Sequence, residues 1–459
     1  MNYTLLIQAH LTELTLICTA LIVLMVDRLI MVRCYPRLRD PVAAGLTVIG
    51  CGIAMCGTFQ ADEAIAAMTA AVAIISLGER FTQQVGEYFL LLLLAAAGLI
   101  FMVHSSDLLN AFLGLETASL TFYVLVALDR RRAEAVQAGF KYFLYGGVSA
   151  ACLLYGLSLI YGLTGSLNFA HCTKAFATMP PSQMAYVAAI MLVVGFAFKL
   201  AAAPFHLWAP DVYRHAATPV AAFIASASKV GGIYLLARVA GAFQREAMLP
   251  ALVVVTVLSL VIGNLAAISQ TSLSRLLAFS AVAHAGYVLV GLCIAPSQPV
   301  PIAAMVYYAV TYAIATVGAF GVVLALRRDA GSDCMSGLDG LNQRSPALAI
   351  LLAVFVLSLA GIPPLAGFFG KFYVFASALR GGSSMTIGVA AFAILMSAVS
   401  LYYYLQVLKR VFVQPLKDDN QPPLQVSRVT MILLTLLALA AILAGLFPQG
   451  LLQSLAPQL

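Results

Sequence analysis

Charged side chains are scarce in this sequence. Asp, Glu, Lys and Arg make up 9% of its 459 residues, whereas hydrophobic residues make up 62%. A soluble domain carries about 25% charged and about 45–50% apolar residues, so water cannot be the solvent for most of this surface. Apolar runs of about 20 residues, the length that crosses a bilayer, recur from end to end. The composition predicts one all-α polytopic membrane domain over residues 1–459.

Cysteine motifs are missing as well. The eight cysteines are scattered, with no CxxC pair and no ferredoxin-type run, so the sequence indicates no metal site of the iron–sulfur or zinc kind. The formal net charge of +7 does not indicate nucleic acid as a partner, because the basic residues form no stripe. They lie between apolar runs, where loop charges orient helices in a lipid bilayer.

Hydropathy predicts about fourteen transmembrane spans. The first has no Lys or Arg before Asp27 and no clear cleavage site, which favours a retained span over a signal peptide. The predicted limits are 4–26, 42–60, 64–79, 86–104, 107–128, 135–162, 183–207, 217–241, 250–269, 273–294, 301–326, 346–376, 386–410 and 429–448.

The basic residues orient these spans. With the N-terminus outside, seventeen of the 25 basic residues fall in inner segments and four fall in outer segments or span ends. This asymmetry predicts that both termini face the periplasm or its equivalent. The remaining four lie inside predicted spans and are all lysines, namely Lys141, Lys199, Lys229 and Lys371.

A lysine inside a span needs a reason, because a charge buried in a membrane costs at least ~2.5–3.5 kcal/mol. A desolvated lysine can lose its proton, whereas arginine effectively cannot, and a proton carrier needs the first behaviour. Glu116 in the fifth span and Lys199 in the seventh are predicted to pair, so that neutralising the carboxylate releases the lysine proton. The alternative is a fixed ion pair that fastens two helices.

Lys229 and His284 extend the candidate path. Lys229 is central in its span and flanked by small residues that leave room for water or close helix packing; the alternative is a lysine that snorkels to the interface. His284 lies inside the tenth span and can relay protons through both ring nitrogens. Its alternative is a hydrogen-bonded core histidine.

Two predicted spans carry a lysine beside a proline break. Lys199 precedes Pro204, and Pro363 and Pro364 precede Lys371. Broken helices in a membrane are tolerated where protein or water satisfies the freed backbone groups. Two such helices five spans apart favour an inverted internal repeat, a recurring transporter design. The alternative is a pair of ordinary proline kinks.

The remaining intramembrane lysine, Lys141, has two open interpretations. It lies one or two turns from the basic DRRR segment, so it can snorkel toward the interface or modulate Lys199. Other polar residues are expected to serve packing or the inner end of the seventh span: Glu13, Asp107, His206, Trp208 and Asp211.

Four segments together resemble the antiporter-like membrane subunits of respiratory complex I, and in particular the subunit N group. They are FKLAAAPFHLWAPDVY, ASASKVGGIY, GNLAAISQTSLSRLLAFSAVAHAGYVLVG and LAGIPPLAGFFGKFYVF. The resemblance implies fourteen helices with two inverted five-helix repeats (helices 4–8, residues 86–241; helices 9–13, residues 250–410), and discontinuous helices 7 and 12. The sequence departs from the family at residues 59–87, around the third helix, where the chain is shorter than the resemblance leads us to expect.

The resemblance also implies roles. Glu116, Lys199, Lys229, His284 and Lys371 match the family's proton relay, and Lys141 matches a lysine typical of subunit N. The subunit itself is then expected to hold no cofactor, with flavin, iron–sulfur clusters and quinone in partner subunits. Expected partners are the neighbouring antiporter-like subunit and small membrane subunits. The expected location is the inner (plasma) membrane of a bacterium, or alternatively an organellar membrane.

Two other functions stay open from the sequence. One is a subunit of a multi-subunit sodium/proton antiporter of the same fold. The other is a scaffold subunit whose buried charges only hold helices together.

Overall fold

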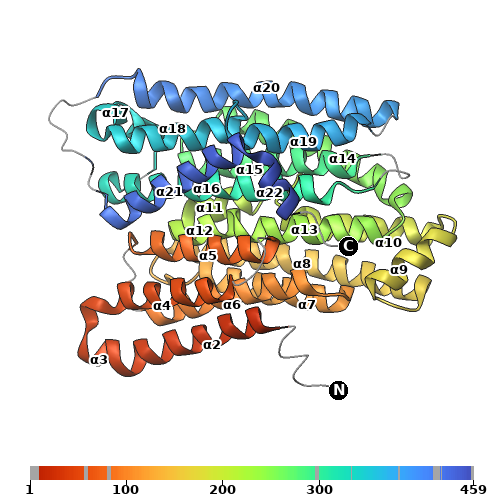
Figure 1. Ribbon diagram of the computed structural model, residues 1–459, viewed down its shortest axis with the longest axis horizontal. Helices are drawn as coiled ribbons and strands as arrows, with labels where there is room; N and C mark the ends of the chain where they lie inside the picture. Colours follow the sequence, from red (N-terminus) through yellow and green to blue (C-terminus); the bar gives the residue numbers. More distant parts are fainter. Residues whose placement is uncertain are drawn as a thin grey trace.

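The computed structural model describes residues 10–55, 60–79, 84–294, 299–331, 333–380, 383–416, 424 and 426–455. Within these ranges the chain is helical and forms no β-strand; two isolated β-bridges join Asp107 to Asn168 and Ser272 to Cys334. Most of the long helices run roughly along one direction (Figure 1). The prediction of an all-α protein is confirmed.

The long helices match the predicted spans closely in most of the chain. The α-helices are α2 Leu11–Val26, α3 Val32–Cys34, α4 Arg39–Ala54, α5 Ala61–Ser76, α6 Val85–His104, α7 Leu108–Val126, α8 Ala133–Thr164, α9 Phe169–Thr178, α10 Gln183–Lys199, α11 Ala209–His215, α12 Thr218–Ala225, α13 Ala227–Ala242, α14 Arg245–Ile268, α15 Leu273–Leu289, α16 Ile302–Ala330, α17 Leu341–Arg344, α18 Pro346–Ala360, α19 Ala366–Arg380, α20 Ser384–Phe412, α21 Arg428–Leu446 and α22 Pro448–Ser454.

Ten helical segments of the described chain are long and apolar enough to cross a membrane, and α10 and α18 are shorter apolar helices. The second and third predicted spans coincide with α4 and α5, which have 16 residues each and are not among these segments. The short helix α9, between α8 and α10, was not predicted, because its ten residues lie in a segment too short and polar to register as a span.

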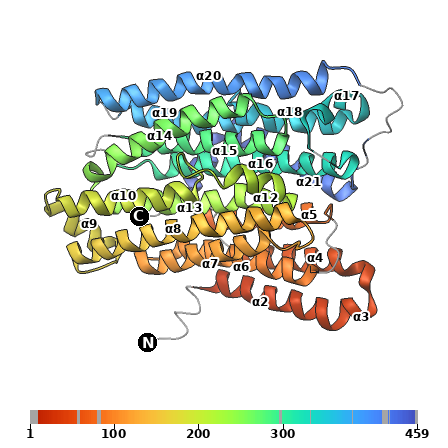
Figure 2. The same cartoon turned by 180° about the vertical axis from the view of Figure 1, so that it is seen from behind.

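The central helices are the most buried. The most apolar stretch of α16 is fully buried, against 28% of that in the segment Leu11–Cys34, which begins with α2, and 28% of that in α20. Figures 1 and 2 show α2 and α20 at opposite edges of the molecule, with α13, α15 and α16 between them. The edge helices therefore present the apolar faces that suit lipid or neighbouring subunits, and the middle helices enclose the core.

Three long helices are interrupted, two of them where the sequence predicts it. The α10–α11 break is stabilised by Ser259, whose hydroxyl accepts from the Ala203 N–H at 2.9 Å, and by the Trp208 indole N–H, which donates to the Phe198 carbonyl at 3.2 Å. These bonds satisfy backbone groups that the break frees. Trp208 thus shapes the end of this span, as expected.

A third break lies at Ser226, between α12 and α13, inside the predicted span 217–241. Its signal in the sequence is weak, since no proline or glycine stands there. The Ser226 hydroxyl donates to the Ala222 carbonyl at 2.6 Å, a local bond that competes with the helix ladder.

Two predicted packing charges have specific partners. The Asp107 carboxylate accepts from the Leu109 and Asn110 N–H groups and so caps α7. Glu13 is buried and lies 2.9 Å from Nδ1 of His104, whose Nε2 lies 3.0 Å from Asp62. His104 therefore joins α2, α5 and α6 through two carboxylates.

Candidate proton relay

Lys199 is the last residue of α10, so the helix break places its side chain in the protein interior. The side chain is buried, its Nζ donates to the Ser119 hydroxyl at 3.2 Å, and it lies 4.9 Å from the centre of the Phe122 ring. Both partners belong to α7. Neutral groups on α7 therefore bind the ammonium directly.

The predicted direct pair between Glu116 and Lys199 is absent from the described ion pairs. Glu116 is partly exposed on α7, one turn before Ser119, and within electrostatic range of Lys199. The serine occupies the position nearest the ammonium. The carboxylate and the lysine interact through space rather than through a hydrogen bond, a coupling that depends strongly on their separation.

Lys229 lies on α13, one turn after the Ser226 break. Its Nζ donates to the Ala281 carbonyl of α15 at 2.7 Å and lies 5.4 Å from the centre of the Tyr312 ring. The side chain is 3% exposed. It points into the core of the subunit, which argues against the alternative of a lysine that snorkels to the interface.

His284 is held by two tyrosines. Its Nδ1 lies 2.7 Å from the Tyr308 hydroxyl of α16, and its Nε2 lies 3.1 Å from the Tyr404 hydroxyl of α20. Tyr404 also bonds the Ser280 hydroxyl. The sequence reading missed both tyrosines; the available signal was a set of phenols inside apolar spans, which need buried partners.

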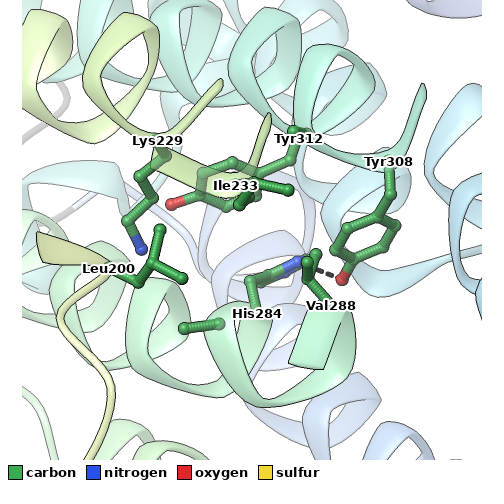
Figure 3. Close-up of a pocket in the computed structure, with 9 residues that line it drawn as sticks. Leu200, Lys229, Ile233, His284, Val288, Tyr308 and Tyr312 are labelled. Atoms are coloured by element: carbon green, nitrogen blue, oxygen red, sulfur yellow. Dashed lines mark hydrogen bonds between the residues drawn. The ribbon is translucent and has the colours of Figure 1, made fainter. Parts of the chain in front are cut away.

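A small cavity separates Lys229 from His284. Both residues line it, together with Tyr308 and Tyr312 (Figure 3). It has room for about one water molecule. Lys229, Tyr308 and His284 thus line one small, mostly apolar space.

Lys371 lies on α19, after the second predicted break. Its Nζ donates to the Ala360 carbonyl and to the Ser397 hydroxyl, each at 2.9 Å, and lies 4.7 Å from the centre of the Tyr287 ring. Ala360 ends α18, so the ammonium lies at the negative end of that half-helix. The first half of the broken helix, α18, thus supplies a hydrogen-bond acceptor for the lysine on its second half, α19.

Asn264 of α14 links two further tyrosines that the sequence reading missed. Its amide donates to the Tyr287 hydroxyl at 3.1 Å, and its carbonyl oxygen accepts from Tyr403 at 3.3 Å. These bonds connect the surroundings of Lys371 with α20, which also carries the Tyr404 partner of His284. The second half of the path is therefore lined mainly by hydroxyl groups.

Lys141 lies apart from this buried row. Its side chain is 46% exposed and pairs with Asp211 of α11 at 2.8 Å. The pair joins α8 to the second half of the broken helix, beside the stacked rings of Tyr142 and Trp208. The contact gives Asp211 a partner that the sequence reading did not identify. A modulating role for Lys141 stays a prediction.

Residues 105–400 match the family described as NADH:quinone oxidoreductase/Mrp antiporter, TM. The chain belongs to this family. The matched range includes all six candidate residues, from Glu116 to Lys371. Within the described residues, no group of three or more His, Cys, Asp or Glu side chains could hold a metal ion.

Individual relatives show which members of the family this chain is similar to. The chain is 46% identical over 375 residues to NADH-quinone oxidoreductase subunit N 2 of Acidobacterium capsulatum, covering 79% of this chain and 74% of that protein. It resembles a chain of respiratory complex I from Thermus thermophilus with a TM-score of 0.78 and 31% identity, over 96% and 98% of the two chains. A chain of the Mrp complex from Dietzia sp. DQ12-45-1b has a TM-score of 0.80 at 21% identity, over 97% and 96% of the two chains, and shows the fold alone.

Proposed function

We propose that this chain is a proton-translocating membrane subunit of an NADH:quinone oxidoreductase. The observation that carries the proposal is the row of buried basic side chains, Lys199, Lys229, His284 and Lys371, whose direct hydrogen-bond partners are neutral oxygens. A buried lysine can exist with or without its proton. Each site can therefore hold a proton and pass it on.

In this proposal the energy of quinone reduction, released elsewhere in the complex, changes the interaction of Glu116 with Lys199. A proton then passes through Lys229 and His284 to Lys371 and leaves on the outer side. This subunit holds no flavin, iron–sulfur cluster or quinone. It acts as the non-redox part of a translocase whose partner subunits carry those groups.

The proposed membrane arrangement has fourteen spans, with inverted repeats over residues 86–241 and 250–410. A lysine at the break of α10 and another beside the break of α18 support this repetition. Both termini face the periplasm in a bacterial inner membrane. The proposed partners are the neighbouring antiporter-like subunit and small membrane subunits of the complex.

The Lys229→Ala variant tests the function. We expect NADH-driven proton pumping in membranes to fall by at least about tenfold, because relay through a positioned acid–base group contributes on the order of 10²–10⁴ in rate. The matched control is Lys174→Ala, since Lys174 is an exposed lysine on α9. Full pumping by a normally assembled Lys229→Ala complex would contradict the relay.

The family description also includes the Mrp antiporter, but the 46% identity to a subunit N protein favours the first function over a sodium/proton antiporter. Purification separates the two functions. Co-purification with NADH-oxidising, flavin-containing partners supports the first, and sodium-dependent proton flux without them supports the second. A scaffold role predicts variants that lose assembly but never lose pumping selectively.

A further inference from the structure

The two partners of His284 are both hydroxyl groups. Tyr308 and Tyr404 come from α16 and α20, and both are almost fully buried. A hydroxyl can donate or accept, whereas a backbone carbonyl or a carboxylate only accepts. A carbonyl or carboxylate at one nitrogen would fix one tautomer of the imidazole. The two phenols therefore do not fix either tautomer of the imidazole.

Three protonation states of His284 therefore keep both hydrogen bonds. In each neutral tautomer one nitrogen donates to a phenol oxygen and the other accepts from a phenol O–H. In the imidazolium both nitrogens donate, and both phenol oxygens accept. Only the hydroxyl hydrogens have to turn, because the heavy atoms already lie 2.7 Å and 3.1 Å apart.

The position of the ring suits this adaptability. His284 is within electrostatic range of both Lys229 and Lys371. The cavity that reaches Lys229 is also lined by Tyr308 (Figure 3), and Tyr404 continues to Ser280 on the other side of the ring. The two phenols thus bond to different nitrogens of a ring that interacts electrostatically with both lysines.

We propose that Tyr308 and Tyr404 are positioning residues that let His284 gain and lose a proton without breaking its hydrogen bonds. The inference rests on the proposed relay function and adds two residues to it. In one transfer, an N–H bond of the Lys229 ammonium breaks and its proton forms a new N–H bond at the bare nitrogen of His284, while the phenol at that nitrogen turns its O–H away and accepts instead. The N–H bond at the other nitrogen then breaks, and its proton reaches the neutral amine of Lys371.

The variants Tyr308→Phe and Tyr404→Phe test this inference in the intact complex. We expect pumping per assembled complex to fall roughly fivefold in each, the factor that corresponds to one lost hydrogen bond of about 1 kcal/mol. The solvent isotope effect in D₂O should rise, since proton transfer at His284 becomes slower. A purely structural role would leave that isotope effect unchanged.

Tyr307→Phe is the matched control. Tyr307 neighbours Tyr308 on α16, but its hydroxyl donates to the Ala444 carbonyl at 2.7 Å. The control removes a phenol hydrogen bond of equal length away from His284, and we expect its pumping and isotope effect to match the unaltered complex. An equal loss in this variant would overturn the inference.

His284→Ala separates this inference from the proposed function. Normal pumping by His284→Ala overturns the relay role and the inference with it. If His284→Ala loses pumping while both phenylalanine variants keep it, the inference alone fails. Adding Tyr308→Phe to His284→Ala should cause no further loss. Where phenylalanine prevents assembly, 3-fluorotyrosine at position 308 keeps the hydroxyl, so we expect pumping to be retained; a loss of pumping in that assembled complex would overturn the positioning role.

Discussion

At the scale of single residues, the surroundings of each lysine matter more than its presence. Lys371 lies against Gly361, which has a φ of +85° and closes the break after α18. A Cβ added there would lie 3.0 Å from Cδ of Lys371 and 3.3 Å from its Nζ. The glycine thus serves both the turn and the space for the lysine.

Gly361→Ala should lower both stability and pumping. The left-handed backbone costs a non-glycine residue roughly 1–2 kcal/mol, and the new methyl group displaces the lysine from the Ala360 carbonyl. Melting temperature and NADH-driven pumping of the assembled complex measure the two effects. Gly388→Ala is the control, because Gly388 lies within α20 with nothing within 4 Å of its added Cβ. Equal behaviour of the two variants would argue against a special role for Gly361.

At the scale of secondary-structure elements, polar contacts hold peripheral helices to the core. The peripheral helix α2 is joined to α6 and α5 through the Glu13–His104–Asp62 contacts. Apolar packing against lipid gives little preference for one helix position over another. The imidazole between two carboxylates therefore specifies how α2 sits against its neighbours.

His104→Gln should weaken this junction. Hydrogen bonds to charged groups contribute about 1.5–3 kcal/mol each, and glutamine lacks the two ring nitrogens that contact Glu13 and Asp62. We expect a lower melting temperature of the purified complex and earlier proteolysis within the segment that carries α2. His171→Gln, at an exposed position of α9, should change neither. An unaltered melting profile in His104→Gln would contradict a stabilising role for the Glu13–His104–Asp62 contacts.

At the scale of the whole molecule, Arg327 of α16 joins segments from both halves of the sequence. Its guanidinium donates to the Arg214 carbonyl at 2.7 Å, to the Ser274 hydroxyl at 3.0 Å and to the Asp333 carboxylate at 3.4 Å. Arg214 belongs to the first half of the chain, and the other two belong to the second. One side chain thus connects the two predicted repeats at one end of the bundle.

Asp333→Asn should loosen this connection at neutral pH. Burial by itself raises the pKa of the Asp333 carboxyl. The charge of Arg327 and the hydrogen bonds from Ser274 and Ser272 lower it by more, so the pKa lies below its ordinary value of 3.8. A carboxyl whose pKa is lower in the folded state stabilises the protein at every pH above its unfolded-state pKa. This stabilisation is lost as the pH falls through the folded-state pKa. Melting temperatures at pH 7 should therefore fall in Asp333→Asn and stay unchanged in Asp129→Asn, where the carboxylate is exposed. Equal melting temperatures for both variants would oppose this assignment.

Much of the fold follows from local features of the sequence. The scarcity of charge and the recurring apolar runs give an all-helical membrane protein, and Pro204 and Pro363 mark two of the three breaks. The break at Ser226 was not predicted, because neither proline nor glycine stands there. The bond seen at this position is the local one from the Ser226 hydroxyl to the Ala222 carbonyl.

The sequence by itself determined which ionisable residues lie in the membrane, because every charge buried there stands out against an apolar background. Only the tertiary structure decided what each of them contacts. Lys199 donates a hydrogen bond to Ser119, which lies 80 residues earlier in the chain. His284 is hydrogen-bonded to Tyr404, which lies 120 residues later. Such partners depend on how distant helices pack, and helical periodicity carries no information about which helix lies opposite. Lysines inside apolar spans thus predicted the candidate relay residues, and only packing decided which hydroxyl groups and which small cavity lie beside them.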